Sequence, residues 1–248
     1  MKQIENYRRW NSVRILAAIV VWIAGHSVPM QAQDSGEESH GFHASVLFGK
    51  TAGHASQDME SAMREAGFDG GQTYCFFGCT ATNYPSTSKG SQTTFTAHYR
   101  LRARYSAGII IASNGNSTTL GKHGLWQALN TDHAARSVAL TASVRYRALR
   151  FEFGPAWNQT RVREITLPAL MSSSWQKNNK PGFIAGATLS VPGFWKIGLD
   201  AGLQYRYIGS SVAGPYTPNS YVGPPATFPA TKINFNHWFF GIGPAIRF

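Results

Sequence analysis

The side chains best suited to chemistry in this sequence are basic residues that recur at every second position of several segments. Arg100, Arg102 and Arg104 alternate with apolar residues, and Arg145 and Arg147 repeat the spacing. With the other charged residues of these segments, the set is Arg100, Arg102, Arg104, Arg145, Arg147, Arg150, Glu152, Lys196, Asp200, Arg206 and Arg247. Guanidinium groups bind oxyanions through paired hydrogen bonds. The set therefore predicts either an anion site or a charge network neutralised by Glu152 and Asp200.

Histidine and serine offer a second chemistry, acyl transfer by a nucleophile and a base. His98 and His237 are the candidate bases, and Ser113 and Ser137 are expected at a comparable depth in the fold. No spacing singles out a nucleophile with its base, because serine is scattered throughout the chain. We therefore expect no catalytic residues and no cofactor.

Residues 1–32 have the layout of a secretory signal peptide. Four basic residues precede an apolar run from Ile15 to Gly25, and Ala32 offers a small residue for cleavage. The run is shorter than the roughly 20 residues that a transmembrane helix needs, although an uncleaved anchor is the alternative. Cleavage would lower the net charge from +11 to +8, because four basic residues and one acid leave. We predict an exported chain with a short periplasmic segment over 33–41.

The rest of the chain alternates with a period of two, the pattern of strands with one apolar face. Strong alternation covers 94–105, 137–147, 149–158, 183–191, 195–207 and 237–248, and weaker strands cover 42–50 and 108–113. The opposite face holds glycine, serine, threonine and arginine with very few acids, which suits an enclosed interior better than a solvated sheet. The apolar face, rich in aromatic residues, suits lipid.

The connections between these strands alternate between short and long. Turns of a few residues alternate with long segments over 51–92, 114–135, 160–181 and 208–232. Short periplasmic turns and long extracellular loops are typical of outer-membrane barrels, and strands in lipid must close because every backbone group needs a partner. The sequence therefore predicts an all-β fold: an eight-stranded antiparallel transmembrane β-barrel over 42–248.

The chain ends in FFGIGPAIRF, an alternating strand with a terminal phenylalanine. In this feature and in its strand pattern over 42–248, it resembles the small eight-stranded outer-membrane β-barrel proteins, the OmpA/OmpX/OmpW-like class. The resemblance implies a place in the bacterial outer membrane, among its lipid and lipopolysaccharide. It also implies that the barrel-assembly machinery recognises Phe240, Ile246 and Phe248.

The first long segment holds a predicted helix followed by two cysteines. Ser56 or Asp58 would cap the helix and Gly67 would end it, with one apolar face made by Met59, Ala62, Met63 and Ala66. Cys75 and Cys79 are predicted to form a disulfide because the chain is exported. Free thiols, or a metal site with His43 and His54, are the alternatives, but the spacing fits no zinc pattern and no metal is expected.

The later long segments offer surface residues for binding. The last one is rich in proline, tyrosine and glycine, and its Tyr216, Tyr221 and Phe228 are candidates for contact with an extracellular ligand. Arg161, Arg163 and Lys177 in the third are candidates for lipopolysaccharide phosphates.

These features predict a structural or surface-binding protein, in adhesion or envelope integrity. Because eight strands leave an interior that side chains fill, the charged set is expected to plug the lumen. The alternative is a narrow channel or transporter for small apolar or anionic solutes, and a lipid-modifying enzyme is a third candidate. Nucleic acid is not an expected partner, since the cations point into a lumen.

Overall fold

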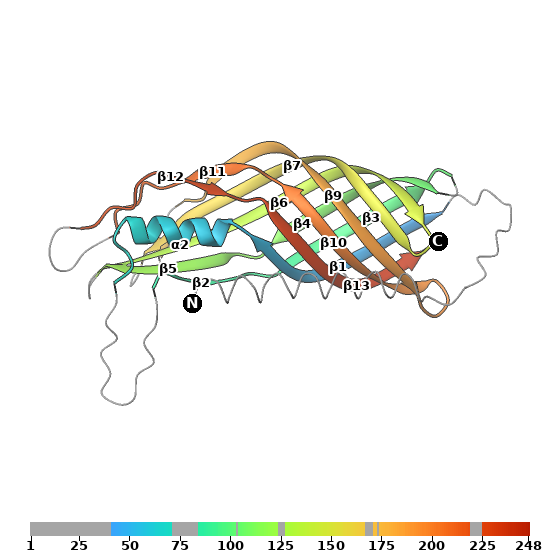
Figure 1. Cartoon of the computed structure of the whole chain (residues 1–248), viewed down its shortest axis with the longest axis horizontal. Coiled ribbons are helices and arrows are strands. Elements are labelled where there is room, and N and C mark those ends of the chain that lie inside the picture. Colours follow the sequence, from blue (N-terminus) through green and yellow to red (C-terminus); the bar gives the residue numbers. More distant parts are fainter. Residues whose placement is uncertain are drawn as a thin grey trace, which may run out of the picture.

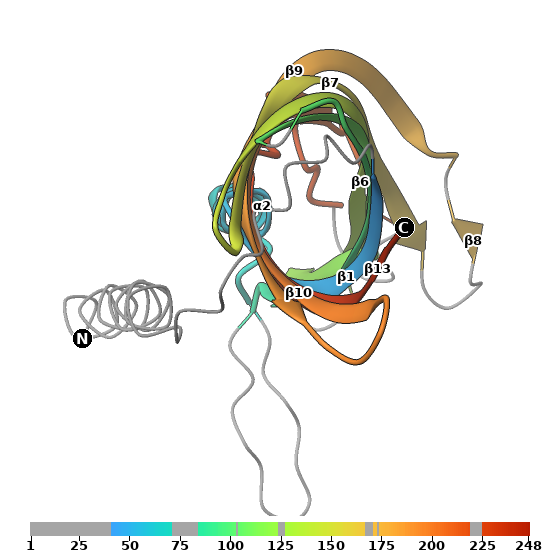
Figure 2. The same cartoon turned by 90° about the vertical axis from the view of Figure 1, so that its right-hand side faces the viewer.

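The computed structural model describes residues 41–70, 84–102, 104–123, 127–166, 171–172, 174–218 and 225–248. Its main body is a closed antiparallel barrel (Figures 1 and 2). The barrel strands are β1 (Phe42–Gly53), β3 (Gln92–Arg100), β4 (Tyr105–Asn114), β6 (Gln127–Tyr146), β7 (Leu149–Thr166), β9 (Gln176–Pro192), β10 (Ile197–Tyr207) and β13 (His237–Arg247). The last strand, β13, pairs with both β10 and β1, so the predicted eight-stranded fold is confirmed.

The barrel turns apolar side chains outward and mainly small or polar ones inward. Along β13, Trp238, Phe240 and Ile242 are exposed, whereas the intervening His237, Phe239 and Gly241 are buried. Aromatic rings such as Trp157 and Tyr207 stand where this apolar band meets the extracellular part. A closed barrel with this surface belongs in the outer membrane. Within the described part of the chain, no helix combines the length and the hydropathy needed to cross a membrane.

The turn between β3 and β4 lies at 101–104, so the strand predicted over 94–105 ends earlier, at Arg100. The backbone N–H groups of Leu101 and Arg102 both donate to the carbonyl of Tyr105, which closes the turn. The alternation continued past the turn because Leu101 and Tyr105 remain apolar beside the lipid. As a result Arg102 is exposed in the turn, and His98 on β3 pairs with His43 on β1 near the periplasmic end of the barrel.

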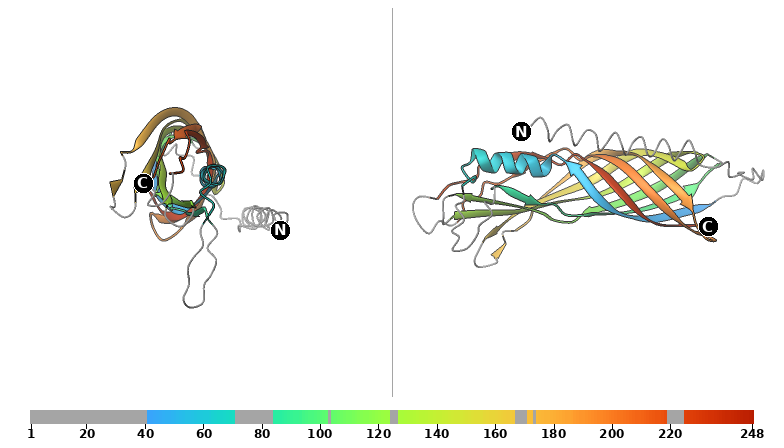
Figure 3. Two further views of the ribbon diagram at one scale, coloured as in Figure 1. Left: turned by 90° about the vertical axis from the view of Figure 1, so that its left-hand side faces the viewer. Right: turned by 60° about the horizontal axis from the view of Figure 1, so that its bottom comes forward.

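Two of the predicted extracellular loops are largely strand. The segment 114–135 contains β5 (Ser117–His123) and the first part of β6, and 160–181 contains the end of β7, β8 (Met171–Ser172) and the start of β9. Strands β6, β7 and β9 therefore continue past the apolar band as one wall (Figures 1 and 3). The prediction was wrong here because the outward residues above the band, such as Gln159 and Asn179, are polar.

The extracellular end has a hydrophobic core of its own. Helix α2 (Ala55–Glu65), β2 (Ser86–Ser88), β11 (Ser210–Ala213) and β12 (Thr231–Asn234) lie at this end, opposite the C-terminus (Figures 1 and 3). The buried residues are Met59, Ala62, Met63, Phe68, Leu129, Ala135, Val162, Ile208, Ala213, Tyr216, Phe228, Ile233 and Phe235. We call this set the extracellular core. It joins α2 and the last long segment to the inner faces of β6 and β7.

The helix itself is close to the prediction. Met59, Ala62 and Met63 are buried, and Gly67 ends the helix with a φ of +80°. Its N-terminal cap is wrong, because His54 occupies that position and no side chain caps the helix. The carboxylate of Asp58 accepts the backbone N–H of Asn234 at 2.8 Å, which ties α2 to the end of β12.

Candidate functional site

The lumen contains a buried carboxylate, Glu152 on β7, which is 1% exposed. One of its oxygens accepts a hydrogen bond of 2.7 Å from the side-chain amide of Gln204 on β10. The other lies 3.3 Å from Nε2 of His98 and 3.6 Å from Nε of Arg150. Since β3 and β7 are not neighbours in the sheet, the contact with His98 crosses the lumen.

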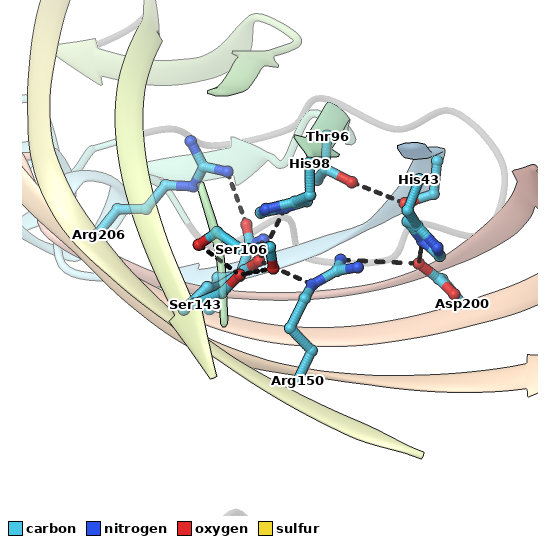
Figure 4. A network of polar contacts seen from close by, with 11 residues as sticks. His43, Thr96, His98, Ser106, Ser143, Arg150, Asp200 and Arg206 are labelled. Atoms are coloured by element: carbon cyan, nitrogen blue, oxygen red, sulfur yellow. Dashed lines mark hydrogen bonds and ion pairs between the residues drawn. The ribbon is translucent and has the colours of Figure 1, made fainter. Parts of the chain in front are cut away.

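A second buried carboxylate, Asp200 on β10, lies next to the first. Its Oδ2 is 2.8 Å from Nε2 of His43 on β1 and 3.8 Å from Nη2 of Arg150. Arg150 thus stands between the two acids, and the group links β1, β3, β7 and β10 (Figure 4). A buried charge is tolerated only when partners compensate it. Removing any one of these charged residues would therefore leave another one buried without a partner, at a cost in stability.

Polar contacts continue from this centre towards the extracellular end. Arg206 donates to the side-chain oxygen of Gln204 at 2.7 Å and to the hydroxyl of Thr94 at 3.3 Å. Gln92 donates to Thr94 at 3.0 Å, and its own oxygen lies 2.9 Å from Nε2 of His237. We call this chain, from His43 to His237, the luminal network. Glu152, Asp200, Gln204 and Arg206 are at most 2% exposed, so side chains fill the lumen at this level.

The charged residues predicted to share the lumen fall into three groups. Arg150, Glu152, Asp200 and Arg206 are buried in the luminal network. A cavity of about 250 Å³ at the periplasmic end is lined by Arg150 and by Arg100, Arg104, Arg145 and Arg247. Arg102, Arg147 and Lys196 are exposed in or beside turns and do not belong to the lumen wall. They lie one or two residues beyond the points where the strands end, and alternation cannot locate those points.

The predicted surface aromatics of the last long segment are not at the surface. Tyr216 is 5% exposed and Phe228 is fully buried, with their rings stacked 5.8 Å apart in the extracellular core. The Tyr216 hydroxyl donates to Oε1 of Gln176 at 3.2 Å. The prediction that they contact an extracellular ligand is therefore wrong, because proline and glycine let this segment fold back onto its own core. Tyr221 lies outside the described residues.

Two further predictions also fall outside the described residues: the disulfide between Cys75 and Cys79, and the signal peptide over 1–32. Of the two histidines considered as metal ligands, His43 contacts Asp200 and His54 precedes α2. The ranges that the structure describes contain no cluster of three or more His, Cys, Asp or Glu side chains placed to hold a metal ion.

The histidines and serines considered for catalysis do not come together. His98 contacts Glu152, His237 contacts Gln92, and Ser113 is exposed on the outer face of β4. One pair went unpredicted: Ser56 Oγ lies 3.4 Å from Nε2 of His133, beside a cavity of about 50 Å³. Burial lowers the pKa of His133 to about 4, so this imidazole is neutral near pH 7.

The Ser56–His133 pair lacks the third group of a hydrolytic triad. Nδ1 of His133 is buried and finds no hydrogen-bond partner among the described residues, so nothing orients the ring as a base. The two residues are 77 positions apart, and no sequence signal connects them. The pair is better explained as packing, since the His133 ring also meets Phe235 edge-on at 6.3 Å.

The residues proposed as an assembly signal lie on the lipid-facing side of β13. Phe240, Ile246 and Phe248 are exposed there. The backbone of Phe248 exchanges two hydrogen bonds with Phe42, at 2.8 and 3.1 Å, where the barrel closes. Their recognition by the assembly machinery stays a prediction.

A cationic surface lies just above the outer aromatic residues. Arg136 on β6, Arg161 and Arg163 on β7 and Lys177 on β9 occupy adjoining strands, with Lys177 directly opposite Arg161. The guanidinium groups of Arg161 and Arg163 lie 5.1 and 4.4 Å from the Trp175 ring. Burial and the neighbouring charges of Arg136 and Arg163 lower the pKa of Arg161. We call these five residues the cationic rim.

Only one cation of this rim has a carboxylate partner among the described residues. Arg163 contacts Oδ2 of Asp132 through Nη2 and Nε, at 2.9 and 3.1 Å. Nε of Arg161 is buried without a hydrogen-bond partner. The rim therefore keeps uncompensated positive charge on the outside of β6, β7 and β9.

No protein-family model and no curated protein sequence matches this chain. Solved structures with a similar fold include the outer membrane protein OprG from Pseudomonas aeruginosa, which is 12% identical. The match covers 86% of this chain and 97% of OprG with a TM-score of 0.46. Neisserial surface protein A is 14% identical, and the match covers 84% of this chain and 97% of that protein with a TM-score of 0.37. Ail, the attachment invasion locus protein of Yersinia pestis, is 12% identical, and the match covers 85% of this chain and 99% of Ail with a TM-score of 0.38. At such identities the likeness concerns the fold alone.

Proposed function

We propose that this protein is a closed outer-membrane barrel that stabilises the envelope by binding lipopolysaccharide at its outer surface. The observation that carries the proposal is the filled lumen. The luminal network occupies the membrane level with side chains that are almost fully buried, and the extracellular core packs against the inner faces of β6 and β7 above it. Two successive obstructions favour a structural or binding role over the channel alternative.

The cationic rim supplies the binding surface. Arginine suits phosphate because its guanidinium donates two hydrogen bonds at once. In the outer leaflet, phosphorylated sugars of lipopolysaccharide lie at the level just above the hydrocarbon. An anion bound between Arg136 and Arg161 would relieve the repulsion between their charges and give the buried Nε of Arg161 a partner.

The closed lumen predicts that the purified protein does not conduct. In planar bilayers containing the full chain, we expect no single-channel steps above the baseline of the lipid, at either sign of voltage. A channel-forming barrel reconstituted in parallel shows that insertion and recording work. Reproducible anion-selective steps from this protein would favour the channel and overturn the closed-barrel reading.

The rim predicts a specific loss of lipopolysaccharide affinity. For R136Q/R161Q in phosphatidylcholine nanodiscs, we expect lipopolysaccharide to bind about tenfold more weakly, because two charge-assisted contacts are lost. The matched control is R64Q/K232Q, which removes two exposed extracellular cations from α2 and β12. Equal affinity in both variants would show that the rim is not the binding surface.

A further inference from the structure

The periplasmic end of the lumen is a cationic cavity that the closed-barrel role does not use. It measures about 250 Å³, far more than a single water molecule needs. The turn at 101–104, the start of β7 and the end of β13 meet around it. Five arginines line it, Arg100, Arg104, Arg145, Arg150 and Arg247, and no aspartate or glutamate is among the lining residues.

Most of this charge is uncompensated within the described part of the chain. Of the five arginines, Arg150 alone has a carboxylate within 4.0 Å, and both of its acids belong to the luminal network. Nε of Arg145 donates to the carbonyl oxygen of Arg147 at 2.9 Å, a neutral partner. Arg247 keeps two buried nitrogens, Nε and Nη2, without a hydrogen-bond partner.

The inner wall of the cavity is a built polar surface. Arg150 is 6% exposed, and its Nε and Nη2 make ion pairs of 3.6 and 3.8 Å but no hydrogen bond. His98, 2% exposed, also lines the cavity; its Nε2 faces Glu152 at 3.3 Å, and its Nδ1 has no hydrogen-bond partner among the described residues. A buried N–H donor without an acceptor lowers the stability of a protein, so these groups favour a ligand that accepts hydrogen bonds from them.

We propose that this cavity binds a phosphate-type oxyanion carrying two or more negative charges. Several guanidinium groups converging on one space repel each other unless an anion lies among them, and a phosphate group has oxygens for several donors at once. The nearby carboxylates cannot do this, because Glu152 and Asp200 are already engaged by Gln204, His98 and His43. The ligand is either a free phosphorylated solute of the periplasm or the phosphate of an inner-leaflet lipid.

Titration with inorganic pyrophosphate by calorimetry, on the full chain in phosphatidylcholine nanodiscs, tests this proposal. We expect saturable binding that weakens about tenfold or more in R104Q/R247Q. Neither of these side chains makes a hydrogen bond or ion pair with a described residue, so the barrel should still form. The control R102Q/K196Q removes two cations from the same end that do not line the cavity, and its affinity should stay within about twofold of wild type, because it leaves all five lining arginines in place.

Nanodiscs containing phosphatidylglycerol separate the two sources of phosphate. Competition that weakens pyrophosphate binding identifies a lipid headgroup as the occupant, and unchanged pyrophosphate affinity identifies a free solute. Heat-modifiable gel mobility checks folding, and R100Q replaces the double variant if that one does not fold. Absence of pyrophosphate binding to wild type, or an equal loss in the cavity variant and the control, would overturn the proposal.

Discussion

Replacing Glu152 with glutamine should lower the free energy of unfolding by about 3–5 kcal/mol, because it removes one partner from a buried group of charges. Glu152 is 1% exposed and faces Arg150, His98 and Gln204. Glutamine keeps the size of the side chain but leaves Arg150 with Asp200 as its single acid. Urea unfolding in detergent micelles, together with the temperature at which the gel mobility shifts, measures the loss.

A matched control and a double variant isolate the charge effect. E65Q removes an exposed carboxylate on α2 and should change stability by less than about 0.5 kcal/mol. R150Q/E152Q removes both charges of the pair, so its loss should be smaller than the sum of the two single losses. An E152Q protein as stable as wild type would mean that the luminal network does not hold the barrel together.

Replacing Phe228 with alanine should cost about 3–5 kcal/mol in the extracellular core and little in the barrel. The Phe228 ring is fully buried and stacks on Tyr216, and its backbone pairs with Tyr216 through hydrogen bonds of 2.8 and 2.9 Å. Removing the ring leaves a cavity between the last long segment and the strand wall. We expect faster proteolysis and faster hydrogen exchange over 208–235, with unchanged gel mobility of the barrel.

The conservative variant Y216F is the control for this region. It keeps the stacked ring and loses one hydrogen bond, from the hydroxyl to Gln176, so its effect should be about 1 kcal/mol. If F228A left protease sensitivity unchanged, the segment would be a solvated loop, as its composition suggested. If F228A instead shifted the gel mobility, the extracellular core and the barrel would unfold as one unit.

The barrel could be predicted because each of its features has a local signal. Lipid outside and an enclosed lumen inside impose alternation on every strand, as Trp238 to Phe248 illustrate. The turn at 101–104 was misplaced because the apolar residues Leu101 and Tyr105 flank it, so the apolar alternation does not stop where the strand ends. The strand extensions at 127–136 and 159–166 were missed because both of their faces carry polar residues, and period-two reasoning needs a contrast between faces.

The candidate sites could be predicted only in part, for a geometric reason. Alternation indicates that Glu152 and Asp200 face inward, but it cannot show that Arg150 stands between them or that His98 reaches Glu152 across the lumen. The depth of each residue depends on the stagger of the strands, which the turns determine. The burial of Phe228 was also out of reach, because the extracellular core that it joins includes residues of α2, β6 and β7, far away in the sequence.

The length of β6 has a consequence for what meets the cell first. At about 3.3 Å per residue, its 20 residues run for roughly 65 Å, whereas the lipid-facing band of such barrels is about 25 Å tall. Even with a tilt near 40°, the strand tips stand about 20 Å or more above the hydrocarbon. A phage, an antibody or a host cell that approaches the protein would therefore meet the extracellular parts of β6, β7 and β9 before the hydrocarbon surface.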